Sequence, residues 1–335
     1  MFYPSGKKNI LVTGGAGFIG SHLCDELVKK NHVICVDNFI TGSEKNIDQL
    51  FSDPAFKFIK HDISVPLKLE DCSELKEFKV ELQGIQEIYN LACPTSPQKY
   101  NNLPIETLMT NSYGTNNVLL LAKKHKAKIL HLSTSAIYGD LDDMNLVRED
   151  NWGKVNPIGP RACYNEGKRF AESLVMSYHS KEDINVKIAR VFNTYGPRMK
   201  LDDGRMIPDF AVNALLNKTV TVYGLEDEMG SYCYIDDMIE GLIRLMNSDI
   251  NMPINLGSED TIRIADLAKK IIDLCNSSSK LEFKEHLPYT SKQLVPDIGL
   301  AKEGLDWFPM VSLEDGLIKT VEDMKVHLKE YRSNF

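Results

Sequence analysis

The stretch CYNEGK, residues 163–168, holds a phenol and a primary amine four residues apart, at Tyr164 and Lys168. In a helix, side chains at this spacing lie on one face and can act together. A free phenol has a pKa of about 10, so a tyrosine that acts as a base at neutral pH needs a positive charge beside it. The ammonium of Lys168 would lower the pKa of Tyr164. Taken alone, the pair is equally typical of an exposed helix face, so its meaning depends on what surrounds it.

Three hydroxyl side chains follow an apolar run that ends shortly before this pair. In HLSTSAIYG they are Ser133, Thr134 and Ser135, at the end of a strand predicted over 128–135. Ligands of parallel sheets gather at the carboxyl ends of the strands. A hydroxyl from this group is therefore expected to hydrogen-bond the oxygen atom that reacts.

A glycine-rich turn lies between the first predicted strand and the first predicted helix. TGGAGFIG places Gly14, Gly17 and Gly20 where backbone N–H groups can approach a diphosphate at a helix N-terminus. Asp37 ends the second predicted strand and suits a ribose diol, which favours NAD over NADP. The positive nicotinamide ring would then lower the pKa of Tyr164 further. Other residues expected at this cofactor are Phe18, Ile19, Asn38, Asp62, Ile63, Leu91, Ala92, Ser133 and Lys168.

Short apolar runs alternate with amphipathic segments through the first half of the chain. Strands are predicted at 9–14, 32–38, 56–62, 87–93, 128–135 and 185–193, with helices around 21–30, 115–125 and 163–174. Strands that are apolar on both faces indicate a parallel sheet covered on both sides, an α/β fold of the doubly wound Rossmann type. After residue 195, helices are predicted at 207–217, 236–247 and 263–275. We therefore expect a cofactor-binding core over 1–195, to which some later segments return, and a smaller α/β substrate lobe mainly over 196–335.

Composition limits the class of protein. The chain has 335 residues and a formal net charge of −8, so it offers no basic stripe for nucleic acid. Its seven cysteines show no paired spacing, which favours reduced thiols in the cytoplasm over disulfides or zinc. The eight histidines show no metal-ligand spacing, and we expect no metal site. The longest apolar runs are too short for a membrane span, and no signal peptide is expected.

Several motifs resemble the extended short-chain dehydrogenase/reductase family, and within it the branch of UDP-glucuronate decarboxylases. They are TGGAGFIGSHL, NLACPTSPQKY, TNSYGTNNVL, STSAIYGD, NPIGPRACYNEGKR, ARVFNTYGPRM and VYG, between about residues 9 and 320. The resemblance implies retained NAD, a hexuronate sugar nucleotide as substrate and a homodimer built on four helices. It implies Tyr164, Lys168 and Thr134 as the catalytic group. Substrate contacts are expected at Ser135, Asn193, Arg198, Arg205 and Tyr223.

The chemistry implied by the resemblance has two stages. Tyr164 takes the proton of the sugar 4-hydroxyl while C4 is oxidised by NAD. The new ketone is β to the C5 carboxylate, so carbon dioxide can leave, and protonation with return of the hydride gives a pentose.

Three positions depart from the family pattern. Ala136 replaces a glutamate implicated in decarboxylation, and Gly230 replaces an arginine that contacts substrate. Leu294 and Val295 stand where a further basic residue precedes PDI. Each lost charge-assisted hydrogen bond is worth about 1.5–3 kcal/mol. Oxidation is therefore the firmer expectation, and decarboxylation the weaker one. A 4-epimerase or 4-dehydrogenase of another nucleotide sugar is the first alternative, and a non-catalytic NAD-binding regulator is the second.

Overall fold

A parallel sheet forms the centre of the molecule. The computed structural model describes residues 6–141, 146–287 and 293–333, and within them seven strands pair in the order β11-β6-β5-β4-β1-β2-β3. Every pairing in this sheet is parallel. The strands are β1 (Asn9–Thr13), β2 (His32–Asp37), β3 (Phe56–Lys60), β4 (Glu87–Asn90), β5 (Lys128–Thr134), β6 (Val186–Val191) and β11 (Pro253–Leu256). The order reverses between β1 and β4, where a doubly wound sheet binds its ligand.

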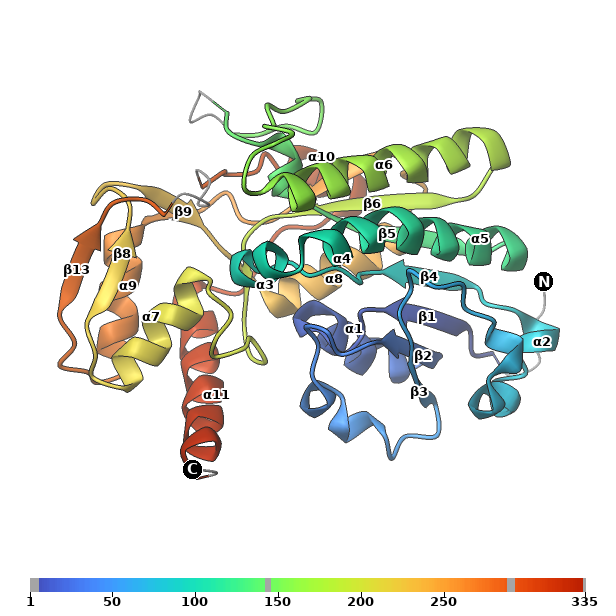
Figure 1. The fold of residues 1–335 in the computed structure, drawn as a ribbon, viewed down its shortest axis with the longest axis horizontal. Helices are drawn as coiled ribbons and strands as arrows, with labels where there is room; N and C mark the ends of the chain where they lie inside the picture. The colour runs from blue at the N-terminus through green and yellow to red at the C-terminus, as the bar shows by residue number, and fades with distance from the viewer. Residues whose placement is uncertain (1–5, 142–145, 288–292, 334–335) are drawn as a thin grey trace.

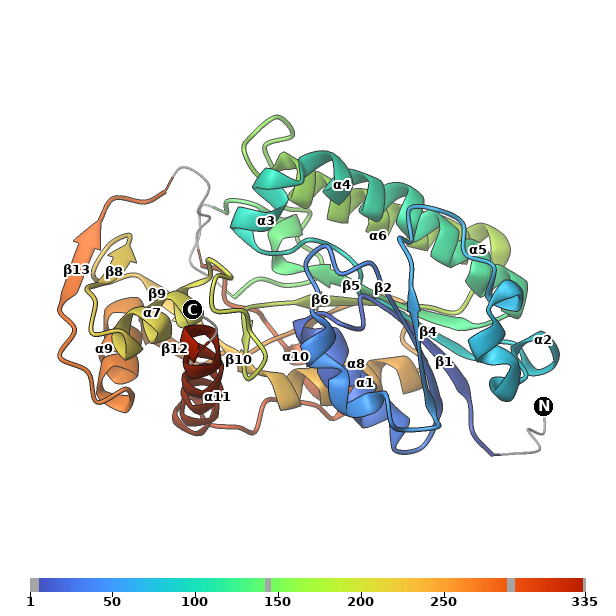
Figure 2. The same cartoon turned by 60° about the horizontal axis from the view of Figure 1, so that its bottom comes forward.

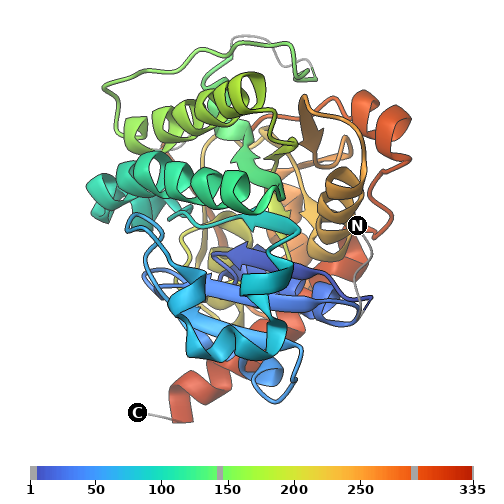
Figure 3. The same ribbon diagram turned by 90° about the vertical axis from the view of Figure 1, so that its right-hand side faces the viewer.

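Helices cover both faces of the sheet, as Figure 2 shows. Apolar side chains on alternating strand positions divide into two buried clusters, one on each face. Because both faces are covered, the strands are almost continuously apolar. One face carries α4 (Pro104–Met109), α5 (Thr115–His125) and α6 (Ala162–Glu182), and a π-helical turn at Thr110–Gly114 joins the first two. The other carries α1 (Phe18–Val28) and α8 (Ile235–Asn247), which pack on each other. Figure 3 shows these layers from the end of the sheet.

A smaller lobe lies beside the carboxyl ends of the strands, at the left of Figure 1. Its helices α7 (Met206–Leu215), α9 (Ile264–Leu274) and α11 (Leu313–Ser333) pack together around a shared apolar cluster. Three two-stranded pairs complete it: β7 (Thr194–Tyr195) with β10 (Cys233–Tyr234), β8 (Val220–Tyr223) with β13 (Leu281–Lys284), and β9 (Met229–Ser231) with β12 (Thr261–Arg263). Three short helices lie outside these groups: α2 (Val80–Gln83), α3 (Pro97–Asn102) and α10 (Gly299–Leu305).

The expected fold class is confirmed, and the six strands predicted in the first half are present with ends shifted by a few residues. The sequence pattern did not indicate β11 or α11. Strand β11 extends the core sheet although it lies far beyond residue 195, and α8 packs on the same sheet. No helix in the described part of the chain is long and apolar enough to cross a membrane.

Candidate active site

The glycine turn forms one wall of a cavity at the carboxyl ends of β1, β2 and β4. Gly14 has φ +72°, and a Cβ atom there would lie 2.7 Å from the Cα atom of Ala92. Gly20 packs on the carbonyl of Gly14, where a side chain would collide. Helix α1 begins at Phe18 with no side-chain cap and no acidic residue in its first turn. Its first N–H groups therefore remain available to an anion in the cavity.

A carboxylate closes the far end of this cavity. The Asp37 carboxylate is buried and accepts hydrogen bonds from the backbone N–H groups of Ala16 (3.1 Å) and Phe39 (2.8 Å). Burial raises the pKa of Asp37, and these backbone donors oppose that effect. Asn38 donates to Asp62 over 3.1 Å, so the ends of β2 and β3 are tied together. The residues from the sequence expectation that line this cavity are Gly14, Gly17, Phe18, Ile19, Gly20, Asp37, Asn38, Asp62, Ile63, Leu91 and Ala92.

Basic side chains from the loop after β7 lie across the same cavity. Arg198 donates through Nη2 to the Asp25 carboxylate over 2.6 Å, while its Nη1 is buried without a partner. Lys200 lines the cavity beside it. An unpartnered guanidinium nitrogen and the open end of α1 fit a diphosphate, and Asp37 fits a ribose diol. The residues present therefore fit a dinucleotide. Arg198, expected at the substrate, lines this cavity and is not among the described lining residues of the one that holds Tyr164.

Tyr164 and Lys168 lie in a second cavity that adjoins the first. The two share Phe18, Ile19, Leu91, Thr95, Leu132, Met199 and Arg205 as lining residues. Tyr164 stands in the first turn of α6, and its ring stacks on Tyr100 with centroids 5.0 Å apart and planes 7° apart. Thr134 lines the same cavity, and its hydroxyl acts to lower the pKa of Tyr164. The structure thus brings the tyrosine, the lysine and the strand-end hydroxyl into one place.

The protein alone does not lower the pKa of Tyr164, contrary to the expectation from the Tyr–Lys spacing. Burial raises this pKa well above 10, the Cys93 sulfur adds to the effect, and Thr134 and Arg205 oppose it. Lys168 points elsewhere, since its Nζ donates to the backbone oxygen of Leu132 over 2.7 Å. Burial lowers the pKa of Lys168, which Cys93 and Glu172 oppose. A reactive phenolate here requires more positive charge than the described side chains provide.

The expected substrate contacts separate into two groups. Ser135, Asn193 and Arg205 line the Tyr164 cavity. Arg205 also donates to the Thr95 hydroxyl over 2.7 Å. Tyr223 stands on β8, 40% exposed, and is not among the described lining residues of either cavity. Ser133 lines the Tyr164 cavity but gives its hydroxyl to the Glu172 carboxylate, away from any reacting oxygen.

The described charged residues that line the Tyr164 cavity are all basic. Arg161, Lys168 and Arg205 line it, and no described lining residue is acidic. The Nε atom of Arg161 is buried without a partner. Such a cavity suits an anionic substrate.

Two of the departures from the family pattern lie in this cavity. Ala136 and Leu294 line it and contribute only apolar groups. Gly230 lies behind Tyr232, whose hydroxyl oxygen would be 2.8 Å from a Cβ atom at that position. Tyr232 thus occupies the space that a larger side chain at Gly230 would need.

Comparison with known proteins identifies the family. The model of the family described as GDP-mannose 4,6 dehydratase matches residues 11–320. The chain belongs to this family. It is 44% identical to UDP-glucuronic acid decarboxylase 6 of Arabidopsis thaliana over 98% of this chain and 91% of that protein. It is 41% identical to UDP-glucuronic acid decarboxylase 1 of Xenopus tropicalis, over 98% and 75%.

Solved structures agree with this assignment. The UDP-glucuronic acid 4-epimerase from Bacillus cereus, in complex with UDP-glucuronic acid and NAD, is 31% identical with a TM-score of 0.81, covering 95% of this chain and 99% of that one. The UDP-glucose 4-epimerase of Thermotoga maritima, with UDP-glucose, is 27% identical with a TM-score of 0.83, covering 96% and 99%. The resemblance to the extended short-chain dehydrogenase/reductase family is confirmed, and with it the expectation that the chain is an enzyme.

Sequence reasoning overlooked two residues of this family member's site. Tyr100 supports the ring of Tyr164, and Thr95 holds Arg205 between the two cavities. Both lie in the motif NLACPTSPQKY, so the signal was present, but stacking and side-chain pairing across distant segments have no local pattern. Within the described residues, no group of three or more potential ligands could hold a metal ion.

Proposed function

We propose that this enzyme binds NAD and oxidises C4 of a nucleotide sugar, and that it acts on UDP-glucuronate as a decarboxylase. The observation that carries the proposal is the position of Tyr164, which shares a basic cavity with Thr134 and Lys168, next to a second cavity whose residues fit a dinucleotide. The relatives named above support the substrate, because they are UDP-glucuronic acid decarboxylases at 41–44% identity over nearly the whole chain.

The first cavity would hold the cofactor. The open N-terminus of α1 and the Nη1 atom of Arg198 would hold its diphosphate, and Asp37 would accept hydrogen bonds from the adenosine ribose. A carboxylate there repels a 2′-phosphate, which supports NAD over NADP. When bound, NAD supplies the acceptor for the hydrogen that leaves C4 and the positive charge that the phenol needs.

The chain's own residues hold the sugar and move the proton. Tyr164 takes the proton from the 4-hydroxyl, and Thr134 fixes the hydroxyl of Tyr164 in place. Lys168 is held by Leu132 at the bottom of the cavity. Arg161 and Arg205 are the cations available to the substrate's diphosphate or carboxylate. Once C4 is a ketone, the C5 carboxylate is in the β position and can leave as carbon dioxide.

A second outcome is favoured by Ala136, which lines the cavity at the position where the family pattern has a glutamate implicated in decarboxylation. A ketone that keeps its carboxylate can be reduced from the opposite face, which gives a 4-epimer. A solved UDP-glucuronic acid 4-epimerase with 31% identity supports this alternative.

One experiment separates the two. UDP-glucuronate labelled with ¹³C at the carboxyl group is incubated with the NAD-loaded enzyme, and both the sugar and the evolved carbon dioxide are followed by NMR. Labelled carbon dioxide with a UDP-pentose or 4-keto-pentose supports decarboxylation. UDP-galacturonate that retains the label supports epimerisation. Absence of any conversion of UDP-glucuronate or of other sugar nucleotides, with NAD bound, would contradict both.

We also propose that the enzyme is a homodimer in the cytoplasm. Apolar side chains lie exposed along α4, the π-helical turn, α5 and α6, on one side of the sheet: Ile105 (66%), Tyr113 (62%), Leu120 (47%) and Phe170 (51%). Two copies of this surface would form a four-helix interface. All seven cysteines are free thiols, which fits a reducing compartment. Phe170→Glu is expected to convert dimer to monomer in light scattering. An unchanged dimer would place the interface elsewhere.

A further inference from the structure

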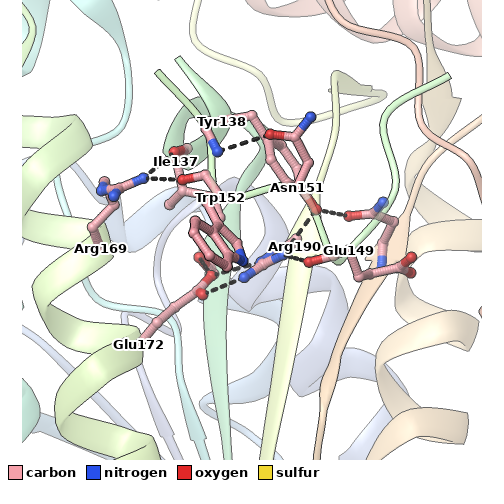
Figure 4. Close-up of polar contacts among 11 residues, drawn as sticks. Ile137, Tyr138, Glu149, Asn151, Trp152, Arg169, Glu172 and Arg190 are labelled. Carbon is pink, nitrogen blue, oxygen red and sulfur yellow. Dashed lines mark hydrogen bonds and ion pairs between the residues drawn. The ribbon is translucent and has the colours of Figure 1, made fainter. Parts of the chain in front are cut away.

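A buried ion pair lies directly behind the Tyr164 cavity. Arg190 on β6 donates from Nε to Oε1 of Glu172 (3.1 Å) and from Nη2 to Oε2 (2.8 Å). Both side chains are about nine-tenths buried, and neither is among the described lining residues of either cavity. Burial alone lowers the pKa of Arg190, but the hydrogen bonds and charges of Glu172 and Tyr138 raise it overall, so the guanidinium stays charged. Figure 4 shows the two side chains meeting between α6 and the sheet.

Glu172 continues the row of side chains that includes the catalytic pair. Tyr164, Lys168 and Glu172 follow one another at intervals of four residues on α6, so they lie on one face. They contact three consecutive residues of β5. Tyr164 lines the cavity together with Thr134, Lys168 donates to the Leu132 oxygen, and Glu172 accepts from the Ser133 hydroxyl. Glu172 is also one of the two groups that favour the charged form of Lys168.

Arg190 fixes Glu172 from the sheet side. It stands opposite Ser133 in the register of β5 and β6, so both side chains leave the sheet on the same face. With both oxygens occupied by the guanidinium, the Glu172 carboxylate has one orientation in which to meet Ser133. The two hydrogen bonds from the Arg190 guanidinium therefore fix the Glu172 carboxylate, which holds the end of β5 against α6 through Ser133.

The same guanidinium also ties down the segment that follows β5. Its Nη1 donates to the Tyr138 hydroxyl (3.0 Å) and to the backbone oxygen of Glu149 (2.8 Å). The Tyr138 hydroxyl donates to Asn255 over 2.7 Å, on the neighbouring strand β11. Arg169, one turn before Glu172, donates to the backbone oxygens of Ile137 and Trp152 (Figure 4). Ser135 and Ala136, which line the cavity, lie between these anchors.

We propose that Glu172 and Arg190 are positioning residues for the oxidation step, which rests on the function proposed above. They hold the Ser133–Thr134 end of β5 at a fixed distance from α6, so that the Thr134 hydroxyl meets Tyr164 and the amine of Lys168 stays in place. They touch neither substrate nor cofactor. Their loss therefore affects the rate of chemistry more than the binding of either ligand.

The test uses the charge-free double variant Glu172→Leu/Arg190→Met in the NAD-loaded enzyme. Replacing both members of a buried ion pair by apolar residues usually preserves folding, whereas removing one does not. We expect thermal stability close to wild type, unchanged NAD content, little change in KM and a fall in kcat of about 10- to 100-fold, because small misplacements of reacting groups have that effect. The limb of the kcat–pH profile that belongs to Tyr164 moves to higher pH, since Thr134 lowers the pKa of that phenol.

The control is Glu182→Gln, which removes the ion pair with Lys123 (2.8 Å) at the far end of the same helix. It is expected to leave kcat and its pH profile unchanged. A folded double variant with wild-type kcat and pH profile would overturn the proposal and leave the pair a purely structural one. If the double variant does not fold, Arg190→Lys, which keeps the positive charge but loses the two-point contact with Glu172, carries the same two readouts. A wild-type enzyme inactive on every sugar nucleotide would count against the proposed function instead.

Discussion

Tyr164→Phe removes one oxygen atom and leaves the rest of the site in place. The ring keeps its stack on Tyr100, at 5.0 Å between centroids, and the Thr134 hydroxyl keeps the backbone N–H of Ala136 as donor at 3.2 Å. The cost to stability is one hydrogen bond, about 1 kcal/mol. In a chain of this size, a loss of that free energy lowers Tm by at most about 2–4 °C.

The cost to the reaction is much larger. A positioned general base contributes about 10²- to 10⁴-fold, which corresponds to about 3–5 kcal/mol of transition-state stabilisation. Activity and stability should therefore separate in this variant. NAD content should stay at the wild-type level, because the hydroxyl lies in the adjoining cavity.

The assay is single-turnover reduction of bound NAD, followed by the absorbance of the reduced nicotinamide after mixing with UDP-glucuronate. Tyr89→Phe is the matched control, since it removes another buried phenol hydroxyl, one without a partner, on β4. Removal of an unsatisfied hydroxyl should leave both the rate and Tm nearly unchanged. If Tyr164→Phe reduces NAD within about tenfold of the wild-type rate, Tyr164 is not the base.

Three further changes test the surrounding structure. Asp37→Asn should weaken NAD binding about 10- to 100-fold in calorimetry by losing charge-assisted hydrogen bonds, with NADP affected less. Gly20→Ala should cost about 1–3 kcal/mol in denaturant unfolding, because its Cβ atom meets the Gly14 carbonyl. Burial and the neighbouring Asp203 raise the pKa of Asp209 to about 6 from 3.8. A carboxyl group whose pKa is higher in the folded than in the unfolded chain stabilises the fold at pH values below its unfolded pKa. This stabilisation is lost as the pH rises through the folded pKa. The free energy of unfolding of the wild type should therefore fall by up to roughly 3 kcal/mol between about pH 4 and 7. Asp209→Asn should remove this fall, as measured by denaturant unfolding at each pH.

The core was predictable from the sequence because its strands are buried on both faces. Apolar runs between helices leave few alternatives to a parallel sheet, and the glycine turn marks the first strand end. Strand β11 escaped detection because it is four residues long and begins with Pro253. Its place in the sheet depends on pairing with β6, more than sixty residues earlier, which no local pattern encodes.

The site was predictable where function depends on spacing and not where it depends on burial. Tyr164 and Lys168 could be placed together from their separation of four residues. The pKa of Tyr164 could not, because it is raised by desolvation that only the folded chain creates. Arg198 sits on the cofactor side because Asp25 on α1 binds it, a contact between residues far apart in sequence. Glu172 continues the four-residue spacing of Tyr164 and Lys168, but its partner Arg190 comes from strand β6.

The two stages of the reaction depend on different parts of the molecule. Oxidation requires groups on β5 and α6, which the core sheet and the Glu172–Arg190 pair hold rigidly. The fate of the ketone depends on what surrounds the rest of the sugar, and there the wall includes Tyr232 and Leu294 from outside that sheet. As carbon dioxide leaves, the negative charge moves from the carboxylate to the enolate oxygen at C4, so a cation bound to the carboxylate opposes the step and an apolar wall does not. Arg161 and Arg205 are the described lining arginines that could bind the carboxylate. If Arg161 or Arg205 binds the carboxylate, the oxidised sugar is expected to be reduced again with its carboxylate intact; if both bind the diphosphate, the carboxylate faces the apolar wall and can leave as carbon dioxide.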